Sequence, residues 1–88
     1  MNERKRLTLI SVLEILVEAD PWSVPEDVLC ARACLRPPRP TPTEVKDACL
    51  ELESRHKALA RDVAPVTETV RISTTPNSAA ILRALREG

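Results

Sequence analysis

The first regular hydrophobic pattern in the chain covers residues 3–19 and predicts an amphipathic helix. Its apolar arc, built at three- and four-residue spacing, consists of Leu9, Val12, Leu13, Leu16 and Val17. The opposite side is a narrow polar stripe that Ile15 interrupts. Ile15 is either an isolated surface aliphatic residue or a sign that this helix is covered on both flanks in a dimer or complex. The first interpretation is favoured because single exposed aliphatic residues are common.

A second, short helix is predicted over residues 24–35. Asp20-Pro21-Trp22 ends the first helix, and Ser23 followed by Glu26 has the spacing of a capping box. We expect Trp22 to cover the small core; the alternative is an exposed anchor for a partner, since tryptophan is enriched in binding hot spots.

The segment RPPRPTP, residues 36–42, has four prolines in seven positions and predicts an extended connection. Pro37 and Pro40 match PxxP, the minimal pattern of an SH3 ligand. A stiff spacer between two packed helices is favoured over such a ligand, because the segment is short and lies between two helices.

The strongest helix start in the sequence opens the third helix, which is expected over residues 41–57. Thr41 can act as N-cap, Pro42 occupies the first helical position, and Glu44 can complete a capping box. The buried stripe is expected to consist of Val45, Ala48, Cys49 and Leu52. The opposite side, which would face a partner, carries Glu44, Asp47, Leu50, Glu51 and Ser54.

After the third helix, the hydrophobic period changes from about 3.6 to 2. Residues 59–64 and 69–74 alternate in polarity, and the intervening Pro65-Val-Thr-Glu68 suits a turn, so a two-stranded antiparallel hairpin is expected. Thr75-Pro76 repeats the helix-start signal of Thr41-Pro42 and opens a last helix through about residue 86. The apolar face of that helix is expected at Ala80, Ile81, Ala84 and Leu85.

The composition bounds the class of protein. With 88 residues the chain is expected to form one domain, residues 1–88, and 43% hydrophobic against 30% charged residues argues against disorder. Trp22 is the single aromatic residue, so the core must be aliphatic and binding of single strands by stacking is disfavoured. Three widely spaced cysteines and apolar runs too short to cross a bilayer lead us to expect a reduced, cytoplasmic protein.

Charge is balanced overall but arranged in blocks. Thirteen basic and 13 acidic residues give a net charge of zero, whereas most nucleic-acid-binding domains are basic. Residues 7–27 contain five acidic and no basic residues, while residues 28–43 contain three arginines and no acid. Such blocks can create faces of opposite sign that steer a partner.

The order of helix, short helix, capped helix, hairpin and closing helix resembles the winged-helix (winged helix-turn-helix) family. The segments that carry this resemblance are VEADPWSVPEDVL, LELESRHKALARDV and VRISTTPNSAAILRAL, and the order of elements extends it over nearly the whole chain. The resemblance implies a small α+β domain with a three-helix core, a two-stranded wing and a C-terminal helix. It says little about function, because one fold hosts many functions.

Two departures from that family bear on function. The glycine that commonly ends its third helix is replaced by His56 or Lys57, of which histidine tolerates a positive φ better than most residues. Winged-helix DNA binders also place basic or amide residues on the partner-facing side of the third helix. This chain places Glu44, Asp47 and Glu51 there, and phosphates would repel them.

A separate set of basic residues could contact phosphates through the turn between helices 2 and 3, the wing and an N-terminal arm, residues 4–6. A solvated surface is the alternative. The seven candidates outside the arm are Arg32, Arg36, Arg39, Arg55, Lys57, Arg61 and Arg71.

Four potential metal ligands, Cys30, Cys34, Cys49 and His56, could approach one another if the second and third helices pack together. Three cysteines and one histidine form a known zinc set. Their spacing matches no common zinc motif, and free cysteine is often buried as a small hydrophobic residue, so no metal or cofactor is expected.

The sequence therefore predicts a single α+β winged-helix domain without catalytic activity of its own, since no arrangement in it demands a concave catalytic site. Two functions remain open. The first, slightly favoured by the acidic third helix, is a protein-interaction or adaptor module that binds a protein partner or its own copy. The second is a DNA-binding transcription regulator. Neither requires a membrane or a small-molecule ligand.

Overall fold

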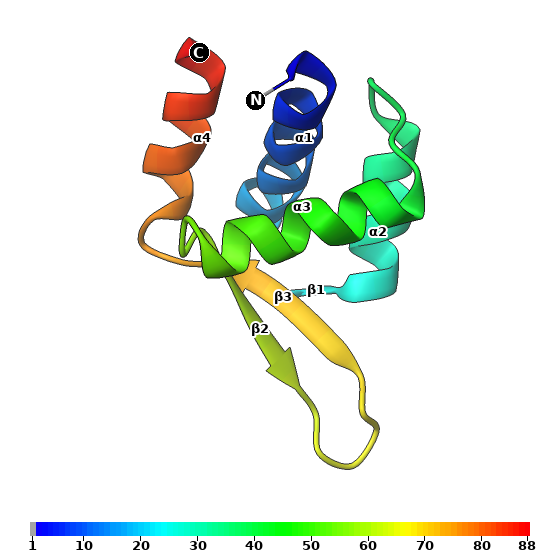
Figure 1. The fold of residues 1–88 in the computed structure, drawn as a ribbon. Coiled ribbons are helices and arrows are strands. Elements are labelled where there is room, and N and C mark those ends of the chain that lie inside the picture. The colour runs from blue at the N-terminus through cyan, green and yellow to red at the C-terminus, as the bar shows by residue number, and fades with distance from the viewer. Residues whose placement is uncertain (1) are drawn as a thin grey trace.

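Four helices and a three-stranded antiparallel sheet make up the fold in a computed structural model that describes residues 2–88 (Figure 1). The α+β class is therefore confirmed. The elements in chain order are α1 (Glu3–Ala19), β1 (Val24–Pro25), α2 (Glu26–Leu35), α3 (Pro42–Ser54), β2 (Leu59–Val63), β3 (Val70–Thr74) and α4 (Ser78–Glu87). In residues 2–88 no helix combines the length and the hydropathy needed to cross a bilayer.

Helix α1 is the centre of the fold. It begins where the Asn2 side chain accepts a hydrogen bond from the Lys5 amide, and it ends at Ala19 as predicted. Figure 1 shows α1 behind α3, with α4 on one flank and α2 on the other. The predicted arc is buried except for Val17, whose surface is 38% exposed.

Ile15 is only 2% exposed, so the favoured interpretation of an exposed aliphatic residue is wrong. The proline-rich connection of the same chain contacts the polar stripe of α1 on both sides of Ile15. Ser11 donates a hydrogen bond to the Pro37 carbonyl, and Arg36 binds Glu18, so both neighbours of Ile15 on this stripe contact the connection. Pro40 in the same connection is buried.

The predicted second helix begins two residues later than expected. Val24 and Pro25 form β1, which pairs antiparallel with Ile72 and Arg71 of β3. The predicted Ser23–Glu26 capping box is wrong, because Pro25 is the N-cap and makes no side-chain capping bond. The Ser23 hydroxyl instead accepts a hydrogen bond from Arg71 Nε at 2.7 Å, which ties β1 to the sheet.

Helix α3 has the capping box that the sequence predicts. The Glu44 amide donates to Thr41 Oγ1, the Glu44 carboxylate accepts from the Thr41 amide, and Pro42 occupies the first turn. Lys57 has a φ of 53°, so it fills the left-handed position predicted for His56 or Lys57. The predicted buried stripe is confirmed: Val45, Ala48, Cys49 and Leu52.

The predicted hairpin is confirmed. Strands β2 and β3 pair from Leu59↔Thr74 to Val63↔Val70, and β3 lies between β1 and β2 in the sheet. Only the base of the hairpin reaches the core, through Leu59 and Ile72. Figure 1 shows that its tip projects well beyond the helices.

Helix α4 packs against α1 with a face that matches the predicted one only in part. The predicted start at Thr75-Pro76 is wrong, because α4 begins at Ser78 and its N-cap is Asn77. Thr75 instead lies in the turn before the helix, where its amide donates to Ser78 Oγ and its Oγ1 accepts from the Asn77 amide. The buried apolar residues are Leu82 and Leu85, with Ile81 partly buried, whereas Ala80 and Ala84 are exposed. The larger leucine side chains cover more apolar surface than the alanines would, and they set the orientation of the helix.

Candidate interaction surface

The predicted partner-facing side of α3 divides into two parts. Asp47, Leu50 and Ser54 point to solvent, and Leu50 is 50% exposed. These three residues form the outward stripe of α3. Glu44 and Glu51 instead turn toward the first two turns of α1, where each binds a basic residue.

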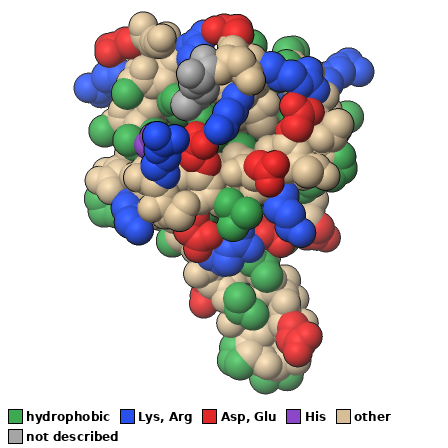
Figure 2. Space-filling model, viewed as in Figure 1, with side chains coloured by type: hydrophobic (Ala, Val, Ile, Leu, Met, Phe, Trp, Pro, Cys, Tyr) green, Lys and Arg blue, Asp and Glu red, His purple; other side chains and the backbone are tan. Residues whose placement is uncertain are grey.

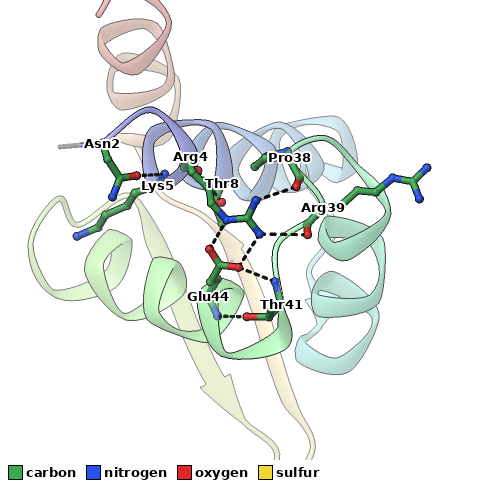
Figure 3. Close-up of polar contacts among 8 residues, drawn as sticks. All are labelled: Asn2, Arg4, Lys5, Thr8, Pro38, Arg39, Thr41 and Glu44. Carbon is green, nitrogen blue, oxygen red and sulfur yellow. Dashed lines mark hydrogen bonds and ion pairs between the residues drawn. The ribbon is translucent and has the colours of Figure 1, made fainter.

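Glu44 joins the start of α3 to α1 (Figure 3). Arg4 binds its carboxylate with two hydrogen bonds of 2.7 and 2.8 Å, and also donates to the carbonyls of Pro38 and Arg39. The Arg4 guanidinium, together with the Thr41 amide, lowers the pKa of Glu44 to about 2. Glu44 is thus a folding contact, and little of its charge is left for a partner.

Glu51 is held by the same end of α1. Lys5 Nζ lies 2.7 Å from its carboxylate, and this contact lowers the pKa of Glu51 below its usual range. His56 Nε2 lies 3.8 Å from the same carboxylate. The proposed N-terminal arm, residues 4–6, is therefore part of α1, and its first two basic residues bind acidic residues of α3.

Three of the candidate phosphate-binding residues are engaged at separate places. Arg36 binds Glu18 of α1 at 2.9 Å, and Arg71 donates to Ser23 beside β1. Arg61 lies between Glu26 of α2 and Glu53 of α3. These arginines do not gather into one basic patch.

The other four candidates are exposed and make no ion pair within 4 Å in residues 2–88. Arg32 lies on α2 and Arg39 in the connection, where Figure 3 shows its side chain pointing away from α1 and α3. Arg55 and Lys57 lie at the end of α3.

The projecting hairpin is apolar and acidic beyond its base. Residues 62–70 include Asp62 and Glu68 but no lysine or arginine. Val66 at the turn is 93% exposed, and Val63 is half-exposed. Figure 2 shows hydrophobic and acidic side chains on the visible face of the hairpin, and red and blue side chains interspersed over the face that α3 crosses.

A hollow of about 320 Å³ separates the start of α2 from the first half of α3. No sequence pattern predicts it, because its lining residues are divided between two helices and the space arises from the way in which those helices cross. We call it the α2–α3 hollow; its lining residues are Glu26, Asp27, Cys30, Pro42, Thr43, Val45, Lys46 and Cys49.

The four potential metal ligands do not converge. Cys49 is buried beneath the α2–α3 hollow, and burial raises the pKa of its thiol to about 12. Burial, followed by the adjacent Cys34, also raises the pKa of Cys30. His56 lies beside Glu51 instead, and residues 2–88 contain no cluster of three or more acidic, cysteine or histidine side chains arranged to hold a metal.

Trp22 is 76% exposed, so the prediction that it covers the core is wrong. It follows the end of α1, where its amide donates to the Ala19 carbonyl. Nearby, Val17, Pro76 and Ala79 line a smaller hollow of about 130 Å³. The far end of α1 therefore has a second surface with exposed apolar groups.

No protein-family model matches the chain, and no curated protein or solved structure is significantly similar to it.

Proposed function

We propose that this chain is a winged-helix domain that acts as a non-catalytic protein-interaction module. The order α1-β1-α2-α3-β2-β3 supports the fold, as does a sheet in which β3 lies between β1 and β2. The β2–β3 hairpin then corresponds to the wing, and α3 to the helix that winged-helix proteins present to a partner.

The observation that carries the function is the chemistry of two exposed regions, the outward stripe of α3 and the hairpin beyond its base. The outward stripe of α3 presents an aspartate and a half-exposed leucine, Asp47 and Leu50. Residues 62–70 of the hairpin add two acids and no base. A DNA duplex that contacted these residues would meet three carboxylates, Asp47, Asp62 and Glu68, and exposed hydrocarbon, whereas phosphate neutralisation supplies much of the affinity for DNA.

The exposed apolar side chains suit a protein partner. Leu50, Val63 and Val66 come from both of these regions, and interfaces between proteins typically have an apolar centre with a polar rim. The interspersed charges around them can supply such a rim (Figure 2).

DNA binding is the second candidate, and one observation favours it. Arg32, Arg39, Arg55 and Lys57 are exposed, and no carboxylate of residues 2–88 is within ion-pair distance of them. They could bind phosphates without placing α3 in a groove.

The test combines a DNA titration with site-specific crosslinking. Fluorescence anisotropy of a labelled random duplex should show no binding at low salt. A photo-crosslinking residue at Leu50 or Val66 should capture a discrete protein partner in extract of the native host. The same residue at Arg83 on α4, which is exposed, serves as the matched control.

Duplex binding that weakens steeply with salt, and that is lost when Arg39 and Lys57 are changed to alanine, would replace the proposal by the DNA candidate. Crosslinking at position 50 or 66 that does not exceed crosslinking at position 83 would also contradict the proposal.

A further inference from the structure

The floor of the α2–α3 hollow can accept an apolar group. Val45 and Cys49 are buried at its base, and Cys30 and Pro42 add apolar surface. Its volume of about 320 Å³ lies at the lower end of the range for ligand sites, which are mostly apolar with a few polar groups. One or two aliphatic side chains match this space better than a large cofactor.

The rim on the α2 side carries more negative than positive charge. Glu26 is paired with Arg61 at 2.5 Å, and Arg61 also lies 3.3 Å from Glu53 of α3. Asp27 is exposed and has no ion-pair partner within 4 Å in residues 2–88, so it is the unpaired acid on this rim. The opposing rim contributes one cation, Lys46.

Arg61 is a cation of the same chain that binds Glu26, one of the residues of this rim. Its guanidinium comes from β2 and lies between carboxylates of two different helices. A second cation supplied from outside would find the remaining negative charge of this rim at Asp27, beside the apolar floor.

We infer that the α2–α3 hollow binds a protein segment that inserts a leucine-like side chain and places lysine or arginine beside Asp27. This inference rests on the proposed function, since it names the class of partner. It also adds the groove between α2 and α3 to the interaction surface that the outward stripe of α3 and the hairpin provide.

The test is an NMR titration of the ¹⁵N-labelled chain with a short capped peptide of alternating lysine and leucine. Two matched peptides replace either leucine by serine or lysine by glutamate. The lysine–leucine peptide should shift the amide signals of Asp27, Thr43 and Lys46, and both matched peptides should bind more weakly.

Two charge changes at the rim should act in opposite directions. Asp27→Lys removes one attraction and adds one repulsion, so the Kd should rise about three- to tenfold. Lys46→Glu should lower the Kd by a similar factor. A change that merely damaged the fold would raise the Kd in both variants, and Asp27→Asn gives an intermediate value if Asp27→Lys folds poorly.

The control is Glu87→Lys at the end of α4, which makes the same charge change as Asp27→Lys outside the hollow. Because salt at physiological concentration screens charges at this distance, Glu87→Lys should change the Kd by less than about twofold. Equal binding of the serine peptide would overturn the apolar part of the inference, and stronger binding of the glutamate peptide would overturn the charge part.

Failure of this inference can be told apart from failure of the proposed function. Peptide-induced shifts confined to Asp47, Leu50 and Ser54, with no effect of Asp27→Lys on the Kd, would contradict binding in the α2–α3 hollow. They would not contradict the proposed protein-interaction function. The absence of any shift would overturn the inference alone. Salt-sensitive duplex binding would overturn the function itself.

Discussion

Replacing Ile15 by alanine tests whether this residue of the polar stripe of α1 is part of the core. Ile15 is 2% exposed although its neighbours along the stripe are polar. Removing a buried isoleucine side chain down to Cβ typically destabilises a protein by about 2–5 kcal/mol. Val17→Ala, two positions away on the same helix, is the matched control, because Val17 is 38% exposed.

The expected loss at Ile15 is large for a chain of this size. At about 0.05–0.15 kcal/mol per residue, 88 residues give a total unfolding free energy of about 4–13 kcal/mol. In a domain this small, each 1 kcal/mol lowers Tm by roughly 4–8 °C. Ile15→Ala should therefore lower Tm by more than about 8 °C, whereas Val17→Ala should cost less than about 1 kcal/mol.

Thermal unfolding followed by far-UV circular dichroism is the appropriate assay, because the single tryptophan is exposed and its fluorescence reports little on the core. If Ile15→Ala leaves the chain unfolded, Ile15→Val, which costs about 0.5–1.5 kcal/mol, provides the measurement. An Ile15→Ala variant no less stable than Val17→Ala would refute the burial of Ile15 in the core.

Two further predictions concern titratable groups. Because the pKa of Glu44 is lowered to about 2 by Arg4, its contribution is complete above its usual pKa of 4.5 and is lost as the pH falls toward 2. The Tm of the native sequence should therefore fall more steeply over this range than that of Glu44→Gln, and equal slopes would contradict the pairing. For Cys49, burial raises the thiol pKa to about 12, so in a Cys30→Ser, Cys34→Ser variant a disulfide reagent at about pH 8 should react only as fast as the chain opens. Modification of the native state at the rate of a free thiol would show that Cys49 is accessible.

The parts of the fold that the sequence predicts correctly are those determined by neighbouring residues in the chain. The bounds of α1, the capping box at Thr41 and the β2–β3 register all depend on residues close together in the chain. The two-residue strand β1 was missed because it has no periodicity of its own and forms only by pairing with Ile72 and Arg71. Ser23 had the spacing of a cap, but Arg71 engages its hydroxyl from the sheet.

The candidate site was harder to predict than the fold, because helical periodicity shows which residues share a face but not what covers that face. The pattern placed Glu44 and Glu51 on an outward side of α3. It contained no information that Arg4 and Lys5, some forty residues earlier, lie against that side. The α2–α3 hollow depends in the same way on how two helices cross.

These pairings change how the acidic third helix should be interpreted. A charge reversal at Glu51 would place a cation beside Lys5 and damage the contact between α1 and α3, so a loss of partner binding would say little about the partner's charge. Asp27 has no such partner within 4 Å in residues 2–88 and lies at the rim of an apolar hollow. Reversal at Asp27 therefore changes the charge that a partner meets while leaving the ion pairs between α1 and α3 intact. Because the charges of Glu44 and Glu51 are paired with Arg4 and Lys5 within the fold, the sign of the partner's charge should be tested at Asp27.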